Sequence, residues 1–273
     1  MQTQFVTVQN IQIRVKEQGN GQPMLFIHGN PDSAEMWDGV IARLPQHGFR
    51  YLAVDLPGYG QSGDTRHFDW STENRGRWIA DVLDALQVTE PVIIVAHDHG
   101  GPFGASFAVQ YPERVKKLVL QNTLFFADYE WHIFGKLWRV PLLGEYLAFT
   151  QQFRITLPVA VWYMKRGSPL LTTRYIADLQ KTWHWRMGKA MLALYRASTP
   201  ALLQGWEERL MAFIGTTPTL VLWGDKDTYL PGRFAEQWHK AGAQLVRFPE
   251  AGHWLAIEKP AEYAHHLTAF IQS

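Results

Sequence analysis

The sequence predicts an α/β fold, in which helices cover both faces of a mostly parallel central sheet and a helical block is inserted. Three observations support this prediction. Short apolar runs alternate with helical patterns over residues 1–122, and the same alternation returns over 215–273. Between them, residues 123–214 show helical spacing and no convincing strand. Because alternating strands and helices form parallel sheets covered on both faces, the inserted block is expected over the carboxyl ends of the strands.

The first half of the chain contains the clearest strand signals. Alternating apolar and polar residues predict an exposed hairpin at 4–8 and 11–15, and short apolar runs predict the strands that follow. These later strands are expected at 24–27, 51–54, 92–95 and 116–121. Helices are expected from Asp32 or Ser33 to Leu44, where either residue could cap the helix, and at 71–86 and 105–111.

The second half begins with the helical block and returns to alternation. The block holds half of the 12 tryptophans, namely Trp131, Trp138, Trp162, Trp183, Trp185 and Trp206. After it, strands are expected at 219–223 and 244–248, and helices at 232–240 and 260–271. This concentration of aromatic residues predicts an apolar slot between the block and the sheet.

Composition excludes several classes of function. The 273 residues carry a formal net charge of +1 and no run of Lys or Arg, so nucleic acid is not an expected partner. No segment reaches the ~18 uninterrupted apolar residues of a membrane span, and the opening MQTQFVTVQN lacks the layout of a signal peptide. With 0 cysteines there is no disulfide, thiol nucleophile or cysteine-based metal site. We expect a cytoplasmic protein without a membrane partner.

The stretch 91–104, PVIIVAHDHGGPFG, carries the most specific pattern in the chain. A β-branched run ends in AHDHGG, and a helical pattern follows at once. The small residues Ala96 and Gly100 lie two positions before and after Asp98, as they do around the strained residue of a nucleophile elbow. We therefore predict that Asp98 occupies the tip of a tight turn between strand and helix.

An aspartate at this tip restricts the chemistry. Its carboxylate, with an ordinary pKa of about 3.9, is ionised at neutral pH and needs no base to act as a nucleophile. Attack on an acyl carbon would give an anhydride that readily collapses back, so the productive target is a saturated carbon bearing a leaving group. The product would be an alkyl ester of Asp98, which water must then hydrolyse.

Two later strand ends supply the groups that this hydrolysis requires. LWGDKD leaves one strand with Asp225 and Asp227, and AGHW leaves the final strand with His253. Nucleophile, acid and histidine thus occur in the chain order of an elbow-type triad. His253 would activate the water while a carboxylate orients its ring. Backbone N–H groups of His99 and Asn30 would hold the oxyanion.

Five motifs, in this order, resemble α/β-hydrolases of the haloalkane dehalogenase and epoxide hydrolase group: HGNP, DLPGYGQSG, AHDHGG, LWGDKDTYLP and AGHWLAIEKP. The resemblance covers essentially the whole chain. It implies an α/β-hydrolase core domain at 1–122 and 215–273, a helical cap domain at 123–214, and no cofactor or metal. It also selects Asp227 over Asp225 as the triad acid, because the motif is W-G-x-x-D followed by a proline, here Pro231.

A few positions bear on the leaving group within this group of enzymes. Asn30 resembles the dehalogenase residue whose side-chain amide binds the departing halide, where epoxide hydrolases usually carry an aromatic residue. His99 stands where dehalogenases have a tryptophan as second halide donor. Tyr195 resembles the late cap tyrosine that protonates an epoxide oxygen. The expected lining of the substrate pocket includes Trp131, Trp162 and Tyr163.

These observations predict a hydrolase that acts, with water, on a small apolar molecule. Hydrolytic dehalogenation of a haloalkane to an alcohol and a halide is the favoured reaction, and hydrolysis of an epoxide to a diol is the alternative. A protein of another class, which only binds or senses a small apolar ligand, is a further alternative. The oligomeric state stays open between monomer and homodimer.

Overall fold

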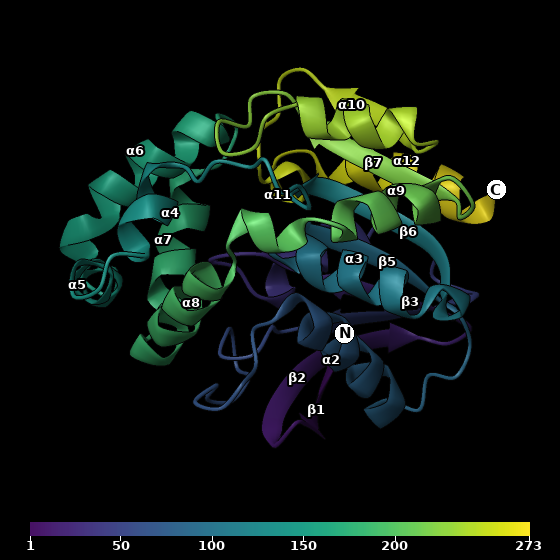
Figure 1. Ribbon diagram of the computed structural model, residues 1–273, viewed down its shortest axis with the longest axis horizontal. Coiled ribbons are helices and arrows are strands. Elements are labelled where there is room, and N and C mark those ends of the chain that lie inside the picture. The colour runs from purple at the N-terminus through teal and green to yellow at the C-terminus, as the bar shows by residue number, and fades with distance from the viewer.

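The computed structural model describes all 273 residues. Figure 1 shows a central sheet flanked by helices, with a group of helices at one end. The strands are β1 Gln2–Val8, β2 Ile11–Gly19, β3 Gln22–Ile27, β4 Phe49–Val54, β5 Val92–Asp98, β6 Val115–Thr123, β7 Thr219–Gly224 and β8 Gln244–Phe248. The α-helices are α1 Asp38–Ile41, α2 Thr72–Ala85, α3 Gly100–Gln110, α4 Ile133–Trp138, α5 Leu143–Thr150, α6 Leu157–Gly167, α7 Thr173–Thr182, α8 Trp185–Ala197, α9 Trp206–Ile214, α10 Arg233–Lys240, α11 Leu255–Glu258 and α12 Pro260–Gln272. Short 3₁₀ helices are η1 Ala34–Trp37, η2 Pro112–Arg114, η3 Arg154–Thr156 and η4 Pro200–Leu203.

The eight strands form one sheet in the order β1-β2-β4-β3-β5-β6-β7-β8. β1 and β2 form the predicted antiparallel hairpin, and β2 also pairs antiparallel with β4. The remaining neighbours are parallel. The predicted fold class, with a mostly parallel central sheet, is therefore confirmed.

Different helices bury the two faces of the sheet, because successive side chains along a strand point to opposite sides. Leu25 and Ile27 of β3 belong to a core cluster that includes residues of α2, α3, α9 and α10. Met24 and Phe26 of the same strand belong to a second cluster with residues of α1 and α12. Every residue of β5 is buried, as expected for a central strand covered on both faces.

The insertion between β6 and β7 is helical, as predicted. In Figure 1, α4 to α8 gather at one end of the sheet, whereas α9 returns along the core beside α3. Residues 206–214, which the sequence analysis assigns to the inserted block, thus pack with the core layer. No helix in the chain is both long and apolar enough to span a bilayer.

The helix expected to end at Leu44 is shorter than predicted. The segment folds as the 3₁₀ turn η1 followed by the one-turn α1, which ends at Ile41. Neither proposed cap residue caps it: the side chain of Ser33 makes no capping hydrogen bond, and that of Asp32 bonds elsewhere. Asp38 and Gly39 have low helix propensity, which helps to explain why the pattern does not continue as a long helix.

Candidate active site

Asp98 lies at the carboxyl end of β5, immediately before α3, in a strained conformation. Its φ of 48° is in the left-handed region, which costs a non-glycine residue of order 1–3 kcal/mol. The turn is possible because Gly100 has no side chain and lets α3 approach the end of β3 closely. A Cβ on Gly100 would lie only 2.5 Å from the carbonyl oxygen of His28. The sequence pattern around Asp98 thus forms a tight strand-turn-helix elbow.

The carboxylate of Asp98 is held from one side by the backbone. Oδ1 of Asp98 accepts a hydrogen bond from the backbone N–H of Asn30 at 2.7 Å. The backbone carbonyl of Asp98 accepts a hydrogen bond from Thr123 Oγ1 at 2.5 Å. Asn30 N–H is one of the two groups predicted to bind an oxyanion, and here it points at the carboxyl group on which that oxyanion would form. Asp98 is buried, with 8% of its surface exposed.

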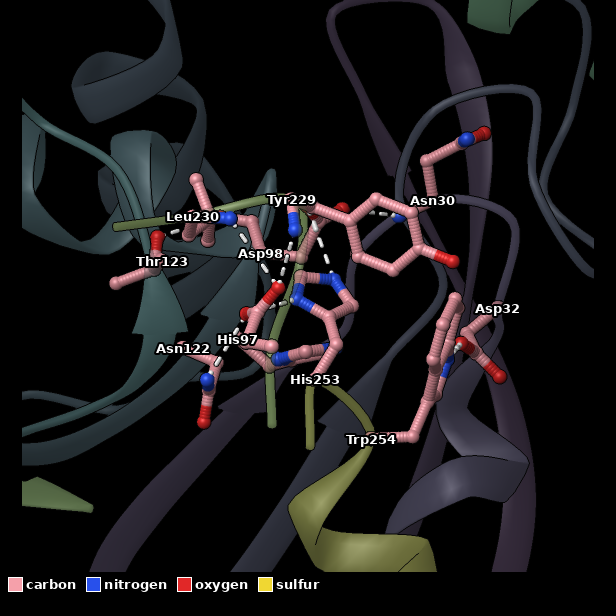
Figure 2. Close-up of polar contacts among 12 residues, drawn as sticks. Asn30, Asp32, His97, Asp98, Asn122, Thr123, Tyr229, Leu230, His253 and Trp254 are labelled. Atoms are coloured by element: carbon pink, nitrogen blue, oxygen red, sulfur yellow. Dashed lines mark hydrogen bonds and ion pairs between the residues drawn. The ribbon is translucent and has the colours of Figure 1, made fainter. Parts of the chain in front are cut away.

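His253 lies between the carboxylates of Asp98 and Asp227 and contacts both. Figure 2 shows the ring of His253 beside Asp98. Its Nδ1–H donates to Asp227 Oδ2 at 2.7 Å, and its Nε2 lies 3.5 Å from Asp98 Oδ2. Asp225 instead pairs with Arg247 at 2.8 Å on the surface. The geometry therefore brings together the three residues of the predicted triad and leaves Asp225 outside it.

Asp227 is fixed by donors that the sequence analysis did not identify. Its Oδ1 accepts from the backbone N–H groups of Tyr229 and Leu230, at 2.7 and 3.1 Å. Its Oδ2 accepts from Asn122 Nδ2 at 2.9 Å. Asn122 also bonds both backbone groups of Gly224, and this arrangement ties the end of β6 to the end of β7.

The electrostatics favour an imidazolium at position 253. Burial opposes ionisation of Asp98, but interactions with the neighbouring histidines His99 and His253 outweigh it and lower the pKa of Asp98 below its ordinary range. Burial also disfavours a charged His253, yet the carboxylates of Asp227 and Asp98 raise its pKa to about 10. In contrast, burial lowers the pKa of His97 to about 3 and that of His99 to about 4, so both rings are neutral at pH 7.

Asp98 and His253 open onto a cavity between the core and the inserted helices. The volume of this cavity that the centre of a water molecule can occupy is about 100 Å³. Of its 21 lining residues, 15 are hydrophobic. Four residues that the sequence analysis names as site residues are among those that line this cavity: Asn30, Trp131, Tyr163 and Tyr195. A mostly apolar cavity with a few convergent polar groups is typical of a site for a small apolar ligand.

Asn30 and Tyr195 present polar groups to this cavity in a defined orientation. The hydroxyl of Tyr59 donates to Asn30 Oδ1 at 3.2 Å, which turns Nδ2 toward Tyr195. Asn30 Nδ2 lies 3.5 Å from the hydroxyl oxygen of Tyr195. The hydroxyl hydrogen of Tyr195 has no acceptor in the protein. Tyr59, in the motif DLPGYGQSG, is a site residue that the sequence analysis missed.

A matching family model places the chain among known proteins. The model described as the alpha/beta hydrolase fold matches residues 22–260. The chain belongs to the α/β-hydrolase fold family. The matched residues contain all five motifs named above, from HGNP to AGHWLAIEKP, and end where the last helix begins.

Curated relatives of this α/β hydrolase carry different activities in their names. A haloalkane dehalogenase of Agrobacterium fabrum is 30% identical, over 96% of this chain and 88% of the relative. Epoxide hydrolase 3 of Mus musculus is 27% identical, over 93% of this chain and 71% of the relative. A cis-3-alkyl-4-alkyloxetan-2-one decarboxylase of Shewanella oneidensis is 27% identical, over 93% and 83%. The crystal structure of the haloalkane dehalogenase DatA from Agrobacterium tumefaciens superposes with a TM-score of 0.78 at 28% identity, covering 99% of this chain and 96% of the other.

Two predicted site residues of this hydrolase lie away from the cavity. The ring of His99 packs behind the cavity wall, against Trp131 and Tyr195 with ring centres 5.7 and 4.7 Å away, and does not line the cavity. Its side chain is therefore wrongly predicted as a donor to the leaving group. Trp162 is wrongly predicted as a lining residue, because it is 59% exposed on the outer face of α6.

His132 lines the cavity of this hydrolase and was not identified from the sequence. Its Nδ1 accepts hydrogen bonds from the hydroxyl of Tyr163 at 2.7 Å and from the N–H of Gly135 at 3.1 Å. An acceptor at Nδ1 requires the proton of the neutral ring to be on Nε2. Burial lowers the pKa of His132 to about 4, so the ring is neutral at pH 7.

Asp32 links the core of this hydrolase to the inserted helices. The buried carboxylate accepts from Trp254 Nε1 at 2.6 Å (Figure 2) and from the hydroxyl of Tyr175 on α7. Burial raises the pKa of Asp32. Trp254 follows His253 directly and lines the cavity, so this contact couples the insertion to the loop that carries the histidine. No group of three or more metal-binding side chains is present in the chain.

Proposed function

We propose that this α/β hydrolase cleaves a bond at a saturated carbon through a covalent ester on Asp98, and that the favoured leaving group is a halide. The observation that carries the proposal is the aspartate at the elbow. An ionised carboxylate faces a mostly apolar cavity, and a histidine within 3.5 Å of it can serve as a base. A serine at this position would support acyl transfer instead.

In the first step, an oxygen of Asp98 forms a bond to the substrate carbon while the carbon–halogen bond breaks. The halide leaves with the bonding electron pair. In the second step, His253 removes a proton from water, and the water oxygen attacks the carbonyl carbon of the ester. The N–H groups of Asn30 and His99 stabilise the resulting oxyanion. Collapse releases the alcohol and restores the Asp98 carboxylate, so one substrate and one water give one alcohol, one halide and one proton.

The polar groups of the cavity support halide departure. Asn30 Nδ2 is turned away from Tyr59 and toward the cavity, where it can donate to the departing halide. The hydroxyl of Tyr195, next to this amide, can supply a second hydrogen bond. The indole N–H of Trp131 also has no acceptor in the protein and belongs to a cavity-lining residue. These donors replace the side chain of His99 in the role predicted for it.

Epoxide hydrolysis is the second candidate function, and the free hydroxyl hydrogen of Tyr195 is the observation that favours it. An epoxide opened by Asp98 leaves an alkoxide on the substrate, which must be protonated. Burial raises the pKa of Tyr195 well above its ordinary value, so the hydroxyl carries its proton at neutral pH. Asp98 would attack one epoxide carbon while its C–O bond breaks, Tyr195 would give its proton to the alkoxide, and the proton that His253 takes from water would restore Tyr195. Epoxide and water then give a diol without release of an ion.

A trapping experiment distinguishes these reactions. His253→Gln removes the base of the second step, so the ester on Asp98 should accumulate. The variant is incubated separately with 1,2-dibromoethane and with styrene oxide, and its intact mass is measured. A bromoethyl adduct identifies a dehalogenase, and a hydroxyphenylethyl adduct identifies an epoxide hydrolase. The double variant with Asp98→Ala is the control and should form neither adduct.

Two results would contradict the proposal. The first is an adduct that maps to a residue other than Asp98 in peptide digests. The second is absence of both adducts from the variant together with turnover of simple aryl esters by the wild-type protein. If wild type binds such ligands without consuming them, the chain is a binding protein rather than an enzyme.

A further inference from the structure

A second, smaller cavity lies behind the wall of the reaction cavity. Its volume, again counted as the space that the centre of a water molecule can occupy, is only about 10 Å³. This is room for one small occupant. Its walls come from the start of α2, the start of α3 and the segment after α8 that leads into η4. Leu124 lines both cavities and separates them. His99 lines only the smaller one.

The smaller cavity contains a buried cation without a carboxylate partner. Arg75 on α2 is 3% exposed, and its Nη2 donates to Ser198 Oγ at 2.6 Å. Its Nε is buried and has no hydrogen-bond partner. The guanidinium lies 5.7 Å from the ring centre of Phe103. Burial lowers the pKa of Arg75 to about 10, against the opposing effect of the Asp69 carboxylate, which makes no ion pair with it, so the group is charged at neutral pH.

The rest of the lining consists of hydroxyl groups, the neutral ring of His99 and apolar groups. Neither ring nitrogen of His99 has a partner, although the side chain is 1% exposed. Ser198 and Thr199 use their hydroxyl oxygens as acceptors for Arg75 and Arg139, which leaves their hydroxyl hydrogens free. No aspartate or glutamate lines this cavity. Burying a charge without a counter-charge is costly, and buried donors without acceptors add to that cost.

The carbonyl end of α8 offsets only part of this charge. Ser198 is the C-terminal cap of that helix, and the partial negative charge at a helix C-terminus stabilises a nearby cation only weakly. Arg139 already occupies this end of the helix, because its Nη1 donates to the carbonyls of Tyr195 and Ser198 at 2.5 and 3.1 Å. Two guanidinium groups therefore share one weakly negative helix end.

We propose that the smaller cavity binds one small monovalent inorganic anion, such as chloride or bromide, between the guanidinium of Arg75, the ring of His99 and the hydroxyls of Ser198 and Thr199. A water molecule also fits the volume, but it brings no negative charge to offset the buried guanidinium. The anion would lie on the far side of His99 from the reaction cavity. The proposal does not depend on which leaving group the enzyme releases.

Bromide tests the proposal directly, because it can be located by anomalous scattering. Crystals of the wild-type protein soaked in sodium bromide should show an anomalous peak between Arg75 Nε and the ring of His99. Asn30→Ala, which alters the reaction cavity, should keep this peak. Density for a water molecule without anomalous signal, at a bromide concentration that occupies other sites, would overturn the proposal.

A solution measurement checks the same site. At constant ionic strength, replacing sodium gluconate by sodium bromide should raise the melting temperature of wild type and of Asn30→Ala, because the anion binds the folded protein. Arg75→Gln should raise the half-saturating bromide concentration at least tenfold. If Arg75→Gln does not fold, Ser198→Ala keeps the charge and removes one donor, and it should raise that concentration severalfold. An unchanged bromide response in the folded variants would contradict the site.

Discussion

Removing the negative charge of Asp98 should lower the pKa of His253 substantially. Asp98→Asn keeps the shape of the side chain and deletes the charge, as formation of an alkyl ester would. Asp98 Oδ2 lies 3.5 Å from His253 Nε2. With an effective dielectric constant of about 20, two unit charges at this separation interact by roughly 5 kcal/mol, or roughly 3.5 pKa units. The pKa of His253, about 10 in the free enzyme, should therefore fall to roughly 6.5.

This shift has a mechanistic consequence. An imidazolium cannot remove a proton from water, so His253 is inactive as a base while Asp98 is ionised. In the proposed mechanism, formation of the ester removes the carboxylate charge, allows His253 to lose its proton near neutral pH, and so makes it a base only when the ester is present. The first proposed step would thereby prepare the second, and water would not be activated before the substrate has reacted.

The assay is an NMR titration of histidine-¹⁵N-labelled protein. Signals of His253 are assigned by their loss in His253→Gln, and its pKa is compared in wild type, Asp98→Asn and Asp225→Asn. Asp225 pairs with Arg247 outside the site, so Asp225→Asn should leave the pKa of His253 unchanged. A value in Asp98→Asn within one unit of the wild-type value, or a wild-type value below 7, would refute this account.

Three further predictions follow from the same contacts. Asp227→Asn should lower the rate of ester hydrolysis by at least a hundredfold in single-turnover kinetics, and Asp225→Asn should stay within twofold; equal effects would contradict the assignment of the acid. Tyr59→Phe removes the hydroxyl that orients the side-chain amide of Asn30, and it should lower kcat/KM on a bromoalkane about tenfold. Tyr51→Phe removes a hydroxyl that bonds the carbonyl of residue 45, outside the site, and should have no effect. Because the folded pKa of His97 is depressed to about 3, its contribution to stability is present above pH 6.5 and is lost as pH falls toward 3, by about 1.4 kcal/mol per pH unit. The free energy of unfolding in urea should therefore fall less between pH 6.5 and pH 5 in His97→Gln than in wild type. An equal fall in the two proteins would count against this contribution.

The sequence predicts the elbow well because its requirements are local. A buried strand, small residues on both sides of Asp98 and an immediate helix leave little conformational choice, and φ at Asp98 is positive as such a turn requires. The choice of Asp227 over Asp225 rests on a motif, and the contact with His253 agrees with it. That the sheet is mostly parallel follows from the alternation of strands and helices on both sides of the insertion, whereas the order of the strands is known only from the structure.

The wrong predictions concern the direction in which side chains point. α6 has apolar residues on several sides, so its sequence does not reveal which face meets the core; Tyr163 faces the cavity and Trp162 faces outward. His99 begins a helix with φ of −64°, and packing against Trp131 turns its ring behind the cavity wall. Such orientations depend on neighbours that are distant in sequence, and no local pattern contains them.

Residues that support the site were missed for the same reason. Asn122 bonds Asp227, which is more than 100 positions away along the chain. Tyr59 bonds Asn30 across two separate loops. Each acquires its role only because parallel strands end at the same edge of the sheet.

The oxygen-transfer route tests the central claim most directly. In a single turnover with excess enzyme in H₂¹⁸O, a covalent ester on Asp98 requires that the product alcohol or diol take its new oxygen from the carboxylate. The product should therefore carry ¹⁶O, and the peptide that contains Asp98 should gain 2 Da from water. If the first product instead carries ¹⁸O and the peptide mass is unchanged, water attacks the substrate directly and Asp98 is not the nucleophile.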